Sequence, residues 1–73
     1  MEIDNIYKTI GQNIKKYRKQ KKITQEQLAQ ITNLSYGYIK NLEAPNVYAT
    51  ISIETLNLIA KALDTTIIHL LSE

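Results

Sequence analysis

Residues 24–43 decide the fold, and they read TQEQLAQITNLSYGYIKNLE. Thr24 and Gln27, three positions apart, have the spacing of a capping box, which marks the start of a helix. Ser35 is a second candidate N-cap, and Asn33 just before it tolerates the left-handed backbone of a tight turn. This stretch therefore predicts two short helices joined by a turn at residues 32–34.

The apolar residues of the same stretch indicate how the two helices pack. Ala29 is small where the second helix must cross the first closely, and Ile39 and Leu42 are spaced to anchor the second helix on the first. A small residue, a turn with positive φ and two apolar anchors are what a helix-turn-helix requires. We expect this motif over about residues 25–44, with the outer face of its second helix free to enter a DNA major groove.

A helical pattern also precedes the motif. Asp4 and Asn5 favour a helix start near the N-terminus. Apolar residues recur along this stretch at gaps of three and four, as on one face of a helix. They are Ile3, Ile6, Tyr7, Ile10, Ile14 and Tyr17. Gly11 lies within this stretch, although glycine costs a helix about 1 kcal/mol relative to alanine. Either a close packing contact requires this glycine, or the helix begins later.

Two more helices are predicted after the motif. Pro45 ends the preceding helix, residues 45–51 form a loop, and Ser52 is a third N-cap candidate. The helix that follows Ser52 has the apolar stripe Ile53, Leu56, Ile59, Ala60 and Leu63. Thr65 or Thr66 caps a last short helix that holds Ile67, Ile68, Leu70 and Leu71. Since no stretch alternates as a strand does, we predict an all-α fold of five short helices, with residues 1–73 forming a single domain.

The composition excludes several kinds of site. The chain has 73 residues, one histidine and no cysteine, which rules out disulfides and a His/Cys metal cluster. No uninterrupted apolar run exceeds three residues, which argues against a membrane span or a signal peptide. A nucleophile–histidine pair would need His69, which has no evident partner and is expected at the surface. We therefore expect no enzyme, no metal and no cofactor, and the lack of cysteine fits a reducing, cytoplasmic compartment.

The net charge of +2 hides an asymmetry between the two parts of the chain. Residues 1–43 carry eight Lys or Arg against four acids, whereas residues 44–73 carry one Lys against three acids. This segregation favours an anionic partner for the basic half, although solvated surface lysines would give the same count. Lys15, Lys19 and Lys22 share one helix face, where a nearby phosphate would relieve their mutual repulsion.

The order of these motifs resembles the Cro/phage-repressor-type (XRE) helix-turn-helix domains. The matching residues run from Ile10 to Leu71 and include Ile10-Gly11, Tyr17-Arg18, Thr24-Gln25-Glu26, Leu28-Ala29, Leu34-Ser35, Leu42-Glu43 and the stretch 52–63. The resemblance implies a lambda-repressor-like DNA-binding domain with the helix-turn-helix at its second and third helices. The chain departs from the family pattern at Asn33, where glycine is common, at Ile68, and in a longer loop after the third helix that has no glycine and no basic residue.

The resemblance also implies roles for particular residues. Arg18 and Glu43 match a family ion pair that joins the first helix to the end of the third. Gln25, after the cap Thr24, matches the first residue of the second helix, where its backbone amide and side chain meet a DNA phosphate. We accordingly count both Thr24 and Gln25 among the expected DNA contacts.

The third helix supplies the candidate base readers, by elimination from the buried pair Ile39 and Leu42. Its expected exposed face consists of Ser35, Tyr36, Gly37, Lys40 and Asn41. Asparagine pairs with adenine and lysine donates to guanine, while Tyr36 can contact a thymine methyl group or a phosphate. Gly37 allows close backbone approach. Tyr38 is expected either to lie against the DNA backbone or to pack under the following loop.

The last helix is too short to bury all of its apolar residues on one core. Ile67, Ile68 and Leu71 form either a packed C-terminal cap or a self-complementary dimer patch, and we favour the dimer. The function we predict is a sequence-specific regulator of transcription, a repressor that binds double-stranded DNA at a palindromic operator as a homodimer. The alternative is a protein-interaction module, such as an antitoxin or coregulator, that uses the same fold to bind a protein partner.

Overall fold

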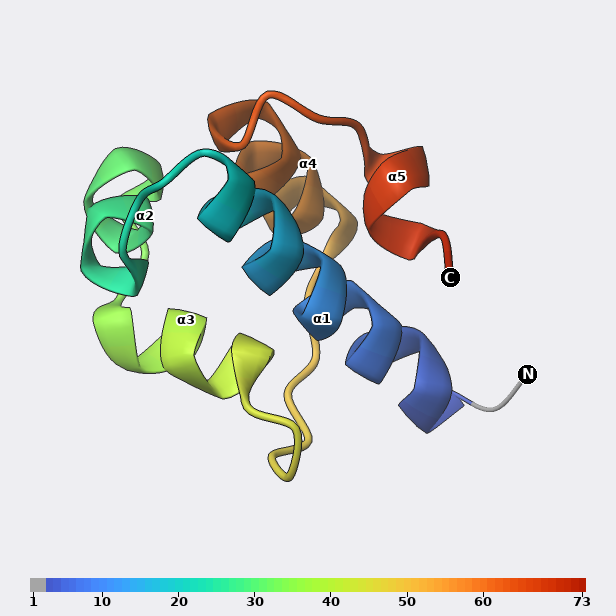
Figure 1. Cartoon of the computed structure of the whole chain (residues 1–73). Coiled ribbons are helices and arrows are strands. Elements are labelled where there is room, and N and C mark those ends of the chain that lie inside the picture. Colours follow the sequence, from blue (N-terminus) through green and yellow to red (C-terminus); the bar gives the residue numbers. More distant parts are fainter. Residues whose placement is uncertain (1–2) are drawn as a thin grey trace.

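Residues 3–73 form five helices, as predicted from the sequence. A computed structural model describes residues 3–73, and it describes side chains from residue 6 onward. The helices are α1 (Ile3–Gln20), α2 (Gln25–Thr32), α3 (Tyr36–Glu43), α4 (Ile53–Ala62) and α5 (Ile67–Leu71) (Figure 1). No strand occurs within these residues, so the all-α prediction is confirmed. The side chains of Ile3, Asp4 and Asn5, which the sequence assigned to the start of α1, lie outside the described part.

Side-chain caps set the start of the other four helices. Thr24 accepts a hydrogen bond from the Gln27 amide at 3.0 Å, and the Gln27 side chain accepts one from the Thr24 amide at 2.8 Å, which completes the predicted capping box. Ser35, Ser52 and Thr66 each accept a hydrogen bond from the amide three positions later. Thr66 is therefore the cap of α5, which settles the choice between Thr65 and Thr66.

Three turn residues adopt left-handed backbone conformations. Asn33 has φ 59°, as its place in the turn between α2 and α3 predicts. Lys22 (φ 62°) and Asp64 (φ 56°), in the turns after α1 and α4, were not predicted; lysine rarely adopts this conformation, whereas aspartate adopts it more often than most residues do. The Lys21 ammonium forms an ion pair with the Asp64 carboxylate and joins these two turns.

The core lies around α1, which runs diagonally through the centre of Figure 1 and packs against α3 and α5. α2 packs against α3 and α4, and α4 also contacts α5. The side chains that the fold buries completely come from all five helices: Ile14, Leu28, Ile39, Ile59 and Leu70. Each helix thus contributes an apolar anchor to one core, and that core fixes how α2 and α3 are presented.

A close helix crossing explains Gly11. A Cβ atom built on Gly11 would lie 2.0 Å from the carbonyl oxygen of Leu42, at the end of α3. No side chain fits at that distance, so the packing explanation for this glycine is confirmed, and α1 does not begin later than predicted. The missing side chain lets the last turn of α3 approach the axis of α1.

Candidate nucleic-acid interface

The exposed face of α3 carries the side chains that the sequence predicts there once the buried pair is set aside. Ile39 and Leu42 are buried under the helix, whereas Ser35, Tyr36, Gly37, Lys40 and Asn41 are all exposed. Tyr36 retains 44% of its surface although it is a large aromatic residue. α3 therefore offers aromatic, amide and cationic groups to a partner without disturbing the core.

A shallow hollow joins the start of α2 to this face. Its lining combines the end of α1, the turn after it, the first turn of α2 and one residue of α3: Arg18, Lys22, Ile23, Thr24, Gln25, Glu26 and Tyr36. The structure thus brings the expected phosphate contacts Thr24 and Gln25 beside the expected base reader Tyr36. Amide groups at a helix N-terminus attract anions, and the Lys22 ammonium adds a positive charge, partly balanced by Glu26.

A buried ion pair ties the end of α3 to α1. The Nε and Nη2 atoms of Arg18 donate to the two carboxylate oxygens of Glu43 at 2.7 and 2.9 Å, and the two side chains are only 10% and 2% exposed. The third nitrogen of Arg18, Nη1, donates to the Ile23 carbonyl oxygen at 2.9 Å. The hydrogen bond and the charge of Glu43 raise the pKa of Arg18 above its ordinary value, although burial opposes this. The guanidinium therefore stays charged in the folded protein.

Gln25 also belongs to this network. Its Nε2 atom donates to Oε1 of Glu43 at 3.1 Å, so the first residue of α2 is linked to the last residue of α3. The sequence assigned the Gln25 side chain to a phosphate and did not reveal this bond, because no local pattern connects residues that lie 18 positions apart. The network orients α3 relative to α1 and α2 from its C-terminal end.

Comparison with known proteins identifies the family of this fold. Residues 14–70 match the helix-turn-helix family. The chain belongs to the Cro/phage-repressor-type (XRE) helix-turn-helix family. This membership places it among DNA-binding transcription regulators.

Two curated relatives resemble this XRE-type domain over most of its length. One is the immunity repressor protein of Bacillus phage phi105, 44% identical over 55 residues, which are 75% of this chain but only 37% of the repressor. The other is the control protein C.SmaI of Serratia marcescens, 37% identical over 68 residues, which are 93% of this chain and 79% of the control protein. The chain thus spans well under half the length of the phage repressor. No solved structure matches the chain.

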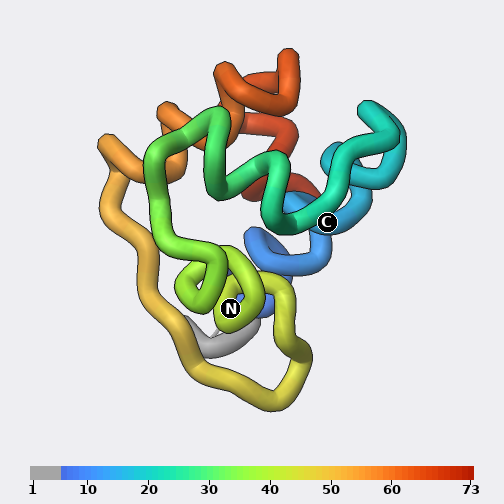
Figure 2. Tube along the Cα trace, turned by 90° about the vertical axis from the view of Figure 1, so that its left-hand side faces the viewer, coloured from blue at the N-terminus to red at the C-terminus, as the bar shows by residue number. Residues whose placement is uncertain are grey.

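The loop after α3 is one of the three places where the sequence departs from the family pattern. It runs from Ala44 to Ser52 as an extended excursion between α3 and α4 (Figure 2). The hydroxyl group of Tyr38 donates to the Thr50 carbonyl oxygen at 2.9 Å, and burial raises the pKa of Tyr38. Of the two roles left open for Tyr38, the structure thus places it against the loop, as an anchor from α3.

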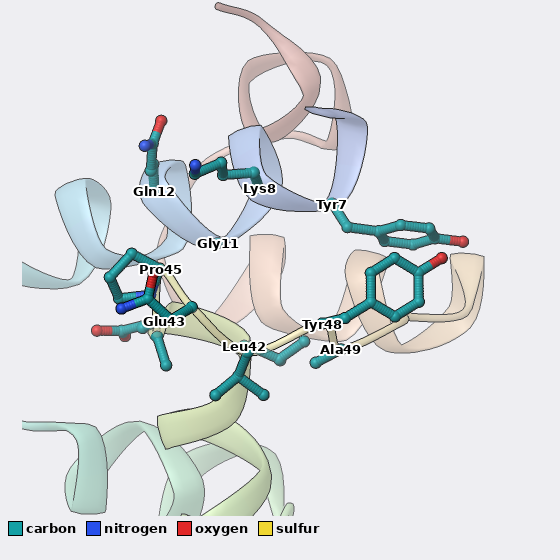
Figure 3. A pocket seen from close by; sticks show the side chains of 12 residues that line it. Tyr7, Lys8, Gly11, Gln12, Leu42, Glu43, Pro45, Tyr48 and Ala49 are labelled. Carbon is teal, nitrogen blue, oxygen red and sulfur yellow. The ribbon is translucent and has the colours of Figure 1, made fainter. Parts of the chain in front are cut away.

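A cavity of about 260 Å³ separates this loop from the first half of α1 (Figure 3). The rings of Tyr7 and Tyr48 meet edge to face at one end, with centroids 5.7 Å apart. Lys8 and Gln12 of α1 lie on one rim, and Pro45 lies across from them. The loop is therefore held at its middle, where Tyr48 meets Tyr7 of α1, and toward its C-terminal end, where Thr50 accepts the Tyr38 hydrogen bond.

The apolar residues of α5 divide between the core and the surface. Ile67 is partly buried and packs against the core, whereas Ile68 and Leu71 are 75% and 43% exposed. The exposed apolar surface of α5 thus consists mainly of Ile68 and Leu71, with Ile67 partly buried beside them, and the dimer interface expected at these three residues stays a prediction. Within the described residues, the α5 surface patch is defined from here on as Ile68 and Leu71.

His69 is exposed, as expected, but it has neighbours that the sequence did not indicate. Its Nδ1 atom lies 3.2 Å from Oγ1 of Thr65, and its ring lies 6.3 Å from the ring of Tyr17, centroid to centroid. Asn13 of α1 adds two hydrogen bonds to the end of α5, to the carbonyl oxygens of Leu70 and Ser72 at 2.8 and 2.7 Å. These contacts fix α5 on α1 and hold the α5 surface patch in place.

Within residues 3–73, no helix combines the length and apolar character that a membrane crossing requires. In the same part of the chain, no three His, Asp or Glu side chains are grouped as a metal ion would need.

Proposed function

We propose that this chain is a sequence-specific repressor of transcription that binds a palindromic operator in double-stranded DNA as a homodimer. The observation that carries the proposal is the exposed face of α3, whose helix is tied to α1 at its C-terminal end by the buried Arg18–Glu43 pair. A recognition helix must present its reading side chains in one orientation, and buried, hydrogen-bonded charges restrict that orientation.

The contacts divide into those that position the protein and those that read sequence. The N-terminus of α2, with Thr24 and Gln25, would bind a phosphate, which fixes register without reading bases. The side chains on the exposed face of α3 would then lie at base edges: Ser35, Tyr36, Lys40 and Asn41, with Gly37 allowing close approach. The Gln25 amide keeps its bond to Glu43 in this arrangement, because its second N–H remains available to the phosphate.

The homodimer is proposed from the α5 surface patch. Ile68 and Leu71 lie on a short terminal helix that is anchored on α1, and exposed apolar side chains of this kind are typical of interaction surfaces. A two-fold axis through this patch would place two copies of α3 on half-sites about one DNA turn apart. The immunity repressor of the phage supports repression as the regulatory outcome.

Selection of bound sequences from random duplex DNA, at about 150 mM salt, tests the proposal, because non-specific binding is weak there. We expect wild type to enrich a palindrome. Asn41→Ala should lose preference at one position of each half-site, by about 1–3 kcal/mol. Lys61→Ala, which removes an exposed cation of α4, is the matched control and should retain the full motif.

Two results would contradict parts of the proposal. Enrichment of single half-sites would agree with sequence-specific binding but contradict the homodimer. In that case Ile68→Glu should leave the molecular mass in solution unchanged. If protein with a native helical spectrum enriches no sequence, the proposed role as a DNA-binding regulator is contradicted. That result would favour the alternative, a module that binds another protein through the α5 surface patch.

A further inference from the structure

Two side chains on the exposed face of α3 interact with each other. The Nζ atom of Lys40 lies 5.3 Å from the centroid of the Tyr36 ring, within the range of a cation–π contact. The two residues are four positions apart, so they lie one turn from each other on the same side of the helix. Both are exposed, and neither contributes to the core.

The kind of partner matters for what Lys40 can still bind. The ion pairs among the described residues are Arg18–Glu43 and Lys21–Asp64, so Lys40 has no carboxylate partner there. A carboxylate would occupy the N–H donors of the ammonium group and would have to be displaced by DNA. An aromatic ring attracts the charge through its face and leaves N–H donors that point away from the ring free for acceptors.

The location of Tyr36 restricts the contact further. Its ring borders the hollow that also contains Thr24, Gln25 and Lys22, where the proposed phosphate contact lies. A ring that borders this hollow and lies against the Lys40 ammonium limits the directions in which the long lysine side chain can extend. Lysine otherwise has many rotamers, and their loss on binding weakens a direct contact.

We propose that Tyr36 is a positioning residue that holds the Lys40 ammonium for a guanine in each operator half-site. Guanine presents two acceptors, N7 and O6, in the major groove, and a positively charged donor with free N–H groups suits both. This inference rests on the proposed function and deepens it, because it names one base pair and the side chains that select it. Tyr36 acts on this base through Lys40.

The test compares base preferences of variants in the same selection experiment. Wild type should enrich a guanine at one position of the half-site, and Lys40→Met should lose that preference alone. Tyr36→Leu should reduce discrimination for guanine at that position by about 2- to 5-fold, the range that an exposed cation–π contact provides. Tyr36→Phe is the matched control and should retain the preference, since it keeps the ring.

The outcomes separate this inference from the function on which it rests. Combining Tyr36→Leu with Lys40→Met should lower guanine discrimination no further than Lys40→Met does, if the ring acts through the lysine. The inference is overturned if Tyr36→Leu leaves the guanine preference unchanged, or if the guanine preference survives in Lys40→Met. Neither result contradicts the proposed function as a DNA-binding regulator. A wild-type chain that enriches no sequence overturns the proposed function and the inference together. The helical spectrum of each variant verifies folding, which exposed positions should preserve.

Discussion

Replacing Gly11 with alanine tests the close crossing of α1 and α3. The new Cβ atom would lie 2.0 Å from the Leu42 carbonyl oxygen, whereas ordinary contact begins at 3.4 Å, so the two helices must separate by about 1.4 Å. Overpacking of this kind costs about 1–3 kcal/mol, and sometimes more. The same movement stretches the charged Arg18–Glu43 hydrogen bonds, which costs about 2 kcal/mol, while alanine returns about 1 kcal/mol of helix propensity. We expect a net loss of about 2–4 kcal/mol.

Thermal and urea unfolding, followed by circular dichroism, measure this loss. A domain of this size changes its melting temperature by about 4–8 °C per kcal/mol, so Gly11→Ala should melt at least about 8 °C below wild type. Gly37→Ala is the matched control, because a Cβ there meets nothing within 4 Å. It should gain up to about 1 kcal/mol. A Gly11→Ala protein that melts at or above the wild-type temperature would refute the packing explanation.

Three further predictions follow from contacts of single side chains. Glu43→Gln leaves the buried Arg18 charge without its partner and should cost about 3–5 kcal/mol in urea unfolding; a loss below about 1 kcal/mol would mean that the pair contributes little. Burial raises the pKa of Tyr38 above its ordinary value of 10.0, so the folded protein holds this proton more tightly than the unfolded chain does. The resulting stabilisation is fully present below about pH 10 and is lost as the pH rises through the folded-state pKa. Urea titrations between about pH 8 and about pH 11 should therefore show a smaller alkaline loss for Tyr38→Phe than for wild type, and equal losses would exclude this role. Asn13→Ala removes two hydrogen bonds to the end of α5 and should cost about 1–3 kcal/mol. Amide hydrogen exchange should then speed up in α5 more than in α2, whereas equal acceleration would show that α5 is not held separately.

Local signals explain why the fold could be predicted from the sequence. Thr24, Ser35 and Ser52 cap helices through amides three positions away, so the residues that decide each boundary are neighbours in the chain. The apolar spacing of Ile39 and Leu42 likewise fixed which face of α3 is buried, and the remaining positions followed by elimination. The pairing of Arg18 with Glu43 was expected from resemblance alone.

Features that depend on tertiary contacts were not predictable in this way. Nothing near Gln25 in the sequence indicates its bond to Glu43, and nothing near His69 indicates the Tyr17 ring beside it. The left-handed backbone of Lys22 has no signal in residue type, because lysine adopts it only where the surrounding structure requires it. The inward packing of Ile67 depended on how α5 lies against α1, which its five-residue pattern cannot specify.

The orientation of α3 is set by its buried side chains Ile39 and Leu42 and by the hydrogen bonds of Glu43 at its C-terminal end. The side chains on its outer face do not contribute to it. Under the proposed function, folding and target choice are therefore encoded by separate sets of positions on one eight-residue helix. New combinations at the outer positions would then arise by point mutation while the domain stays intact, so a lineage of such proteins would acquire different operators without passing through unfolded intermediates. The same separation makes this small domain a scaffold on which recognition can be rewritten by design.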